Sequence, residues 1–268
     1  MLNWVISVKF DIGDLVTRKS YNHDLVFIVT DIIDGTYYLK GSNVRLYADS
    51  PEEDLDEYLD DEPDADEEKF MERIKPKNDL NRTDYFYLPG KILHIDGDKD
   101  YLNKCLKYYD EANIWAMGIC EKEENIAMYI KEWLQEYRPN IVIITGHDAY
   151  YKRMGEKNDL SSYKNSSSFV EAVREARKYE QSHDKLIVIA GACQSDYEEL
   201  IKAGANFASS PKRINIHALD PAIIATKMSL SDINKDIDLK KILEQTKYGS
   251  NGIGGIITKG TMYIGYPR

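Results

Sequence analysis

Cysteine is scarce in this sequence. Among 268 residues there are three cysteines, at positions 105, 120 and 193. Three scattered cysteines form neither an even disulfide framework nor the paired spacing of a metal site. We therefore expect a protein of a reducing compartment that binds no metal ion. Cys105 and Cys120 are predicted to be structural, which leaves Cys193 for chemistry.

Long apolar runs and an excess of basic residues are also missing. No stretch approaches the ~20 apolar residues of a membrane helix, and the N-terminal MLNWVISVKFDIGD has too short an apolar run for a signal peptide. Lys and Arg number 35 against 46 Asp and Glu, a net charge of −11. Because phosphate binding needs a basic face, nucleic acid is not an expected partner. The sequence predicts an intracellular protein without a membrane contact.

Composition divides the chain into three regions. Residues 1–49 contain short β-rich runs broken by Gly, Asn and Asp, typical of a small SH3-like or KOW-like β module. Residues 50–84 are dominated by Asp and Glu and contain too little apolar surface to offset the entropy of ordering, so we predict a mobile acidic linker. Residues 85–268 alternate apolar runs with helical patterns and form the predicted α/β domain.

The α/β domain has a regular order. Helical periodicity is clear over residues 123–137, where Ile126, Ile130 and Leu134 fall on one stripe. Continuous runs of Ile, Val and Leu flank such segments, as in strands that are buried on both faces. The resulting order β-α-β-α-β-α-β-α-β predicts a mostly parallel, doubly wound sheet covered by helices.

Two of the predicted strands end at a reactive side chain. The run IVIIT is followed by Gly146 and His147, and the run LIVIA leads through GA to Cys193. Open α/β sheets bind their ligands in the crevice outside the carboxyl ends of the strands. We interpret Cys193 as a nucleophile and His147 as the general base that takes its proton.

The residues around this pair predict its support. An S-x-x-E capping box begins at Ser195, which would start a helix just after Cys193. The N–H groups and the positive end of that helix would favour a thiolate and could hold an oxyanion. Gly146, Gln194 and Asp148 flank the two reactive side chains and are the candidates for oxyanion binding or support.

Two other functional classes stay open. His217, in INIHALDP, is a rival base because it follows Cys193 and lies beside Asp220. With His217 as base, the chain would suit a class I glutamine amidotransferase or a related amidohydrolase, although Ser195 replaces the Gly usual in that class. A non-catalytic scaffold, in which the N-terminal β module is the working part, is the other alternative.

The chain order resembles that of the caspase-like clan of cysteine peptidases. His147 precedes Cys193 by 46 positions (193 − 147), and each side chain follows an apolar strand. One departure is visible. The clan usually has Gly directly after the His, whereas this chain has Gly146 before it and Asp148 after it.

A closer resemblance is to the YabG family of sporulation-specific peptidases. It is carried by DIGDLVTRKSY, LPGKILHIDGD, ITGHDAY and GACQSDYEELIKAGANFASSPKRINIHALDP, and it extends over most of the chain. It implies a cysteine endopeptidase without a cofactor that processes spore coat and cortex-associated proteins, with the enzyme itself as a further candidate substrate. The implied location is the mother-cell cytoplasm of a sporulating bacterium, with retention in the spore coat as a further expectation.

The same resemblance implies cleavage after Arg, which requires a carboxylate in the substrate pocket. In the caspase-like clan the charge that selects this residue lies at the end of the first strand. Asp96 and Asp98 occupy that neighbourhood here, and Asp220 is a third candidate. Asp96 and Asp98 would equally suit the cap of the helix that follows.

Overall fold

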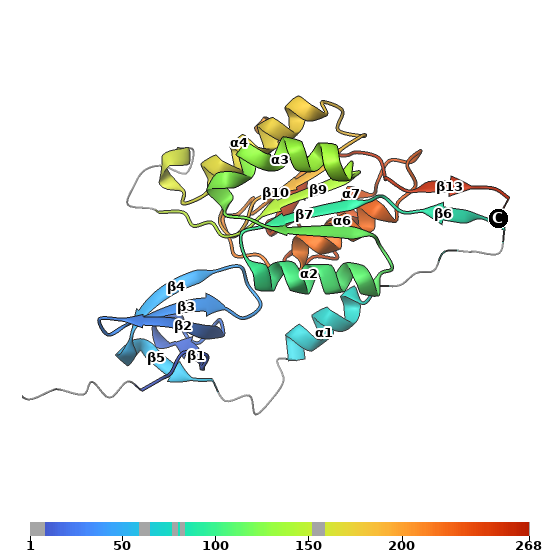
Figure 1. The fold of residues 1–268 in the computed structure, drawn as a ribbon. Coiled ribbons are helices and arrows are strands. Elements are labelled where there is room, and N and C mark those ends of the chain that lie inside the picture. The colour runs from blue at the N-terminus through green and yellow to red at the C-terminus, as the bar shows by residue number, and fades with distance from the viewer. Residues whose placement is uncertain (1–8, 59–64, 77–79, 81–83, 152–158, 268) are drawn as a thin grey trace, which may run out of the picture. The chain divides into compact units, whose positions relative to one another are not determined.

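The computed structural model of the chain describes residues 9–58, 65–76, 80, 84–151 and 159–267. Its contacts divide the chain into two compact units, Met1–Glu68 and Lys69–Arg268. Each unit has its own sheet and its own core, as the ribbon in Figure 1 shows.

The N-terminal unit is a five-stranded antiparallel sheet with the order β4-β3-β2-β1-β5. Asp34 and Gly35 form the two-residue turn between β2 and β3, and both have positive φ angles, as the favoured hairpin turn requires. Phe27, Tyr37 and Leu39 are fully buried in its core. The strands are β1 Leu15–Arg18, β2 Phe27–Ile33, β3 Thr36–Gly41, β4 Tyr47–Pro51 and β5 Leu55–Glu57, with 3-10 turns at Lys19–Tyr21 and Glu52–Asp54.

The acidic region differs from the predicted mobile linker. Residues 50–57 complete the N-terminal sheet, where Leu55 is fully buried. Helix α1, Ala65–Ile74, contributes Phe70 and Ile74 to the core of the second unit, and the Ile74 carbonyl accepts a hydrogen bond from Tyr108. The prediction used the average composition of the acidic region, in which these few apolar residues carry little weight. Each of them is nevertheless buried in a hydrophobic core. The remainder of the predicted linker lies partly outside the described residues.

The second unit contains a six-stranded sheet with the order β12-β11-β10-β9-β7-β8. Every neighbouring pair is parallel except β11 with β12, which confirms the predicted mostly parallel sheet. The chain runs from β7 outward to β8 on one side and from β9 outward on the other, so the strand order reverses between β7 and β9. The strands are β7 Ile92–Asp96, β8 Ala116–Cys120, β9 Ile141–Thr145, β10 Ile187–Ala190, β11 Phe207–Ser209 and β12 Ile253–Gly255.

Helices cover both faces of this sheet. Helices α3, α4 and α5 bury their apolar stripes on one face, and α1, α2, α6 and α7 bury theirs on the other (Figure 1). Helix α3 begins and ends where its periodicity predicts. The helices are α2 Lys99–Glu111, α3 Glu123–Tyr137, α4 Ser166–Tyr179, α5 Tyr197–Ala203, α6 Asp220–Ser229 and α7 Leu239–Leu243, with 3-10 turns at Leu160–Ser162 and Gly249–Asn251.

A separate two-stranded ribbon joins segments far apart in the sequence. Strand β6, Phe86–Leu88, pairs antiparallel with β13, Tyr263–Gly265. The second unit is therefore closed by residues from both of its ends.

The central strand β9 should carry much of the stability of the second unit. Ile143 in β9 is fully buried, whereas Ile257 is 71% exposed. We expect Ile143→Ala to lower the free energy of unfolding by about 2–5 kcal/mol, because it removes a buried side chain and leaves a cavity. The matched Ile257→Ala change should stay within about 0.5 kcal/mol of the parent. Urea unfolding followed by circular dichroism measures both, and equal effects would contradict the assigned core.

Candidate active site

The two reactive side chains predicted from the sequence follow neighbouring strands. Strands β9 and β10 pair in parallel with Ile144 opposite Ala190. The Gly191 N–H donates to the Ile144 carbonyl over 3.0 Å, and the Thr145 hydroxyl donates to the Gly191 carbonyl over 2.9 Å. The pairing therefore holds to the last residues of the strands, and the two turns that carry His147 and Cys193 leave the sheet side by side.

The Cys193 thiol is enclosed by a later segment of the chain. The Ile216 N–H donates to Cys193 Sγ over 3.2 Å, and Sγ lies 3.8 Å from the Ile216 carbonyl oxygen. The next residue, Gln194, has a φ of 59° and donates its N–H to the Ile214 carbonyl over 3.1 Å. The segment Ile214–Ile216 thus covers the turn that carries Cys193, and Cys193 is fully buried.

His147 is held by its side chain and by its backbone. Its Nε2 donates to Asp98 Oδ2 over 3.0 Å, and the ring packs against Tyr101 with 5.5 Å between centroids. Its backbone N–H donates to Glu123 Oε1 over 2.8 Å, and its carbonyl accepts from the Asn165 amide over 2.8 Å. Only 7% of the residue is exposed, so its position is defined on every side.

The carboxylates predicted for a substrate pocket are buried and engaged within the chain. Asp98 Oδ1 accepts the N–H groups of Asp100 and Tyr101 and so caps α2, which is the alternative that the sequence left open. Asp96 Oδ1 accepts the Asp98 N–H over 2.9 Å, and Oδ2 lies 3.5 Å from His94 Nε2. The other carboxylate oxygen of Asp98, Oδ2, accepts the hydrogen bond from His147, so Asp98 faces His147 at the ends of their strands.

Asp220 and His217 form a loop of their own. Asp220 accepts the N–H groups of His217 and Lys247 at 2.9 and 2.8 Å. His217 Nδ1 accepts the Leu219 N–H over 3.1 Å, so its proton lies on Nε2. The ring of His217 stacks edge-on against Phe70 with 4.8 Å between centroids. These contacts organise the turn that precedes α6, one residue beyond the Ile216 contact with Cys193.

Asp148 ties together the two turns and α4. Its carboxylate accepts the N–H groups of Ala149 and Asn165 and the hydroxyls of Ser166 and Ser195. Burial raises the pKa of the carboxyl above its ordinary value, and these hydrogen bonds oppose the increase. The side chain is thus a support that fixes the loop of Cys193 to the loop of His147.

Ser195 does not cap α5 as predicted. The cap is Asp196, whose side chain accepts the Glu199 N–H. The Ser195 hydroxyl instead accepts the Ala192 N–H over 2.9 Å and donates to Asp148. Both Ser and Asp cap helices well, so the sequence alone does not decide between Ser195 and Asp196. Ser195 instead binds Asp148, a partner distant in sequence, and Asp196 becomes the cap.

Glu123 is a site residue that sequence reasoning missed. It begins α3 and lies against Gly97 and Gly146, where an added Cβ would come within 2.3 and 2.2 Å of its Oε1. A side chain at either glycine would therefore displace the carboxylate that holds the His147 N–H. The available signal was a Gly after each of two strands together with a Glu at the start of a helix.

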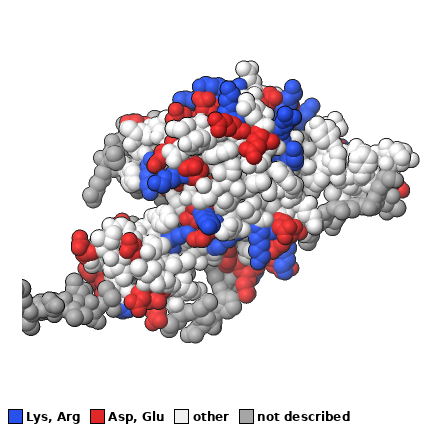
Figure 2. Space-filling view, in the orientation of Figure 1, with Lys and Arg blue, Asp and Glu red and all other residues white. Residues whose placement is uncertain are grey.

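Other sites in the described residues are less suited to this chemistry. No group of three His, Cys, Asp or Glu side chains suited to a metal ion occurs among them. Over the ranges that the structure describes, no helix is both long and apolar enough to cross a membrane. Acidic and basic side chains of described residues are intermixed over the face shown in Figure 2.

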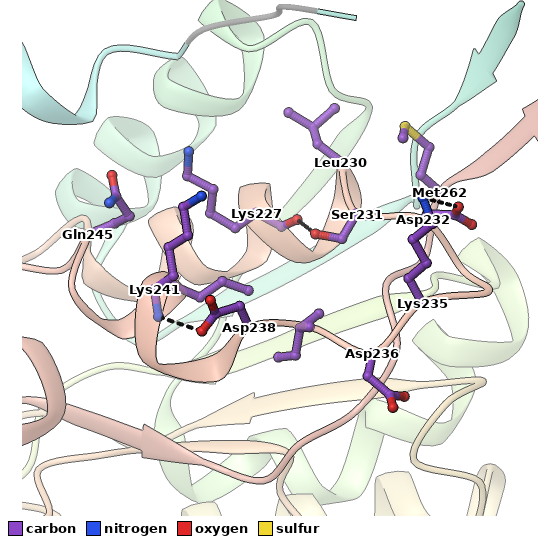
Figure 3. Close-up of a pocket in the computed structure, with 12 residues that line it drawn as sticks. Lys227, Leu230, Ser231, Asp232, Lys235, Asp236, Asp238, Lys241, Gln245 and Met262 are labelled. Atoms are coloured by element: carbon purple, nitrogen blue, oxygen red, sulfur yellow. Dashed lines mark hydrogen bonds and ion pairs between the residues drawn. The ribbon is translucent and has the colours of Figure 1, made fainter.

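A cavity of about 590 Å³ lies between α6 and α7 (Figure 3). Its apolar lining includes Ile237, Ile242 and Met262. Its charged groups satisfy one another in part, as in the ion pair of Lys235 with Asp232. This cavity is not the candidate active site, because neither Cys193 nor His147 lines it.

Comparison with known families defines the class of protein. The sequence model of a peptidase family matches residues 11–267, almost the whole chain, so the protein is a peptidase. The family is described as YabG peptidase U57, and the chain belongs to it.

A curated relative supports the same family. The sporulation-specific protease YabG of Bacillus subtilis (strain 168) is 41% identical over 286 residues, which cover 97% of this chain and 99% of the relative. The similarity therefore extends over both units, including the N-terminal sheet. The chain is therefore a homologue of a sporulation-specific protease over almost all of both sequences.

The enclosure of Cys193 predicts the order in which the thiols react. Cys120 is exposed, although partial burial and the negative charges of Asp96 and Asp98 raise its pKa and lower its thiolate fraction. We expect iodoacetamide to modify Cys120 well before Cys193, with tryptic mass spectrometry as the measurement. In urea both should react. Earlier modification of Cys193 in the folded protein would mean that Ile214–Ile216 opens readily.

Asp148 predicts a pH dependence of stability. Because its pKa is raised in the folded chain, its stabilising contribution is complete below about pH 4 and is lost as the pH rises through the raised pKa. We expect Asp148→Asn to remove this loss, so that the urea midpoint of the variant improves relative to wild type between about pH 4 and about pH 7. The substitution also alters the hydrogen bonds of this side chain. That change shifts the stability of the variant by the same amount at every pH, so it does not affect the pH dependence.

The control for this measurement is Asp159→Asn. The pKa of Asp159 is lowered by hydrogen bonds from Ser161, so its stabilising contribution is present above about pH 4 and is lost as the pH falls below that value. Asp159→Asn should therefore leave the difference from wild type nearly constant between about pH 4 and about pH 7, and give a trend of the opposite sign only below about pH 4. A flat difference between wild type and Asp148→Asn across the pH range would show that burial of Asp148 does not favour its protonated form.

Proposed function

We propose that the protein is a cysteine endopeptidase in which Cys193 is the nucleophile and His147 the general base. The observation that supports this most directly is the register of β9 with β10, which brings the two turns to the same edge of the sheet. The base follows one strand and the nucleophile follows its neighbour, an order that favours a caspase-like arrangement. Peptidase family membership supplies the reaction class.

The chemistry is acyl transfer at a peptide carbonyl. His147 takes the thiol proton, and the Cys193 thiolate attacks the carbonyl carbon. Backbone N–H groups near Cys193 and Gly146 stabilise the oxyanion. The C–N bond then breaks as the imidazolium protonates the leaving amine, and water activated by His147 hydrolyses the thioester.

A substrate must displace the segment that covers the thiol. In the resting structure the Gln194 N–H donates to Ile214, and the Ile216 N–H donates to the sulfur. We infer that Ile214–Ile216 shifts when a peptide binds, which makes the Gln194 N–H available to the oxyanion. Asp148 then acts as the support that keeps the two turns together during this shift.

Cleavage after Arg is the proposed specificity. The three aspartates predicted for the pocket, Asp96, Asp98 and Asp220, are buried and hydrogen-bonded. Glu123 is only partly buried and lies at the same strand ends. We therefore add it as the candidate that contacts the guanidinium of a substrate.

The proposed substrates are spore coat and cortex-associated proteins, and the enzyme itself is a further candidate. The substrate class follows from the resemblance to the YabG family, and the Bacillus subtilis relative, a sporulation-specific protease, supports a role in sporulation. The proposed location is the mother cell of a sporulating bacterium, with retention in the coat.

A second base is favoured by one observation. His217 directly follows Ile216, whose backbone contacts the Cys193 sulfur, so a shift of this segment would move His217 relative to the thiol. An amidase that uses His217 is therefore the alternative, with His147 in a structural role.

The decisive experiment compares variants on an unstructured, Arg-containing protein, with cleavage sites mapped by mass spectrometry. We expect Cys193→Ala and His147→Ala to lose at least about 10³-fold in rate, because each removes a group that takes part in the chemistry. The matched controls Cys120→Ala and His217→Ala should retain most of it. Glu123→Gln, which keeps an oxygen acceptor for His147, should redistribute the cuts away from Arg.

Three outcomes would contradict the proposal. Activity that survives Cys193→Ala would exclude the nucleophile. Loss with His217→Ala but not with His147→Ala would transfer the base to His217. Unchanged cleavage sites in Glu123→Gln would remove it from the substrate pocket.

A further inference from the structure

We propose that Asp98 positions the imidazole of His147 and stabilises its protonated form during catalysis, which makes Asp98 the third member of the active site. This rests on the proposed function, in which His147 exchanges a proton with Cys193. It gives Asp98 a role different from substrate selection.

The Asp98 carboxylate is fixed before it meets the histidine. It caps α2, with Oδ1 accepting the N–H groups of Asp100 and Tyr101 at 2.9 and 3.1 Å. Its own N–H donates to Asp96 Oδ1, at the last residue of β7. The side chain is 5% exposed, so water does not compete for it. These contacts fix the orientation of the carboxylate, so that its second oxygen, Oδ2, points at His147.

The contact determines which nitrogen of His147 reacts. Since Nε2 donates to Asp98, proton exchange with the thiol has to use Nδ1. The carboxylate keeps the proton on Nε2 and leaves Nδ1 able to accept one. When Nδ1 takes the thiol proton, the positive ring lies 3.0 Å from a buried negative charge. Hydrogen bonds between two charged groups are stronger than those between neutral groups.

The remaining groups around the pair do not duplicate this role. Tyr101 packs on the ring, and Glu123 binds the backbone N–H rather than the imidazole. Asp148 accepts hydrogen bonds from α4 and from the Cys193 loop. Other ionisable groups that face this region are Asp96 and His94 on β7, Lys99 at the start of α2, Cys120 at the end of β8, and Glu121 just after it.

The test separates the histidine contact from the helix cap. Asn and Ser cap helices about as well as Asp, so Asp98→Asn and Asp98→Ser should keep the fold and the melting temperature. We expect both to lower kcat/KM by about 10²-fold or more. Asn should lose more than Ser, because its amide can donate to Nε2 and force the proton onto Nδ1. The control is Asp100→Asn, which removes an exposed charge two residues away.

The pH–rate profile gives a readout that a purely structural role would not move. Removing a buried negative charge weakens proton binding by both the imidazole and the thiol, so both limbs of the profile should move to lower pH in the Asp98 variants. Asp100→Asn should leave them in place, because solvent screens an exposed charge.

Three outcomes of these experiments decide between the possible roles of Asp98. If the Asp98 variants match Asp100→Asn in rate and profile, Asp98 is only a helix cap and the inference is overturned. If Cys193→Ala or His147→Ala still cleaves, the proposed dyad fails whatever Asp98 does. If Cys193→Ala and His147→Ala lose cleavage activity, and the pH–rate profiles of Asp98→Asn and Asp98→Ser are shifted, both proposals are supported.

Discussion

The parallel pairing of β7, β9 and β10 is the constraint on which this site depends. Parallel strands in register end at one edge of a sheet, so the residues that follow them are neighbours whatever their distance in sequence. Asp98, His147 and Cys193 follow these three strands in that order. The strand order reverses between β7 and β9, and such a switch point is where open α/β sheets bind their ligands.

Three carboxylates convert this proximity into defined positions, and each does so by a different contact. Asp98 binds the imidazole of His147, Glu123 binds its backbone N–H, and Asp148 connects its turn to that of Cys193. Each acidic group is placed by local structure, two of them at helix N-termini. Buried carboxylates cost free energy unless they are hydrogen-bonded, so these contacts compensate in part for the desolvation that they require.

The parts of the fold that depend on periodicity were predictable. Buried parallel strands and the helix from Glu123 to Tyr137 follow from runs and stripes that any window of sequence displays. The placement of Cys193 and His147 after neighbouring strands follows from the same patterns. The contacts of Asp98 with His147, of Ser195 with Asp148 and of Glu123 with His147 did not follow, because each joins segments distant in sequence. In the acidic region, a few apolar residues outweighed an unfavourable average, since a buried Leu55 or Phe70 contributes more than neighbouring solvated charges oppose.

The segment Ile214–Ile216 has a consequence for the chemical lifetime of the protein. Oxidation of a cysteine to sulfenic and higher acids needs a thiolate that solvent-borne oxidants can reach. Cys193 is enclosed and Cys120 is exposed, so peroxide would reach Cys120 first. The sulfur to which the proposed mechanism assigns the chemistry is therefore the better protected of these two thiols.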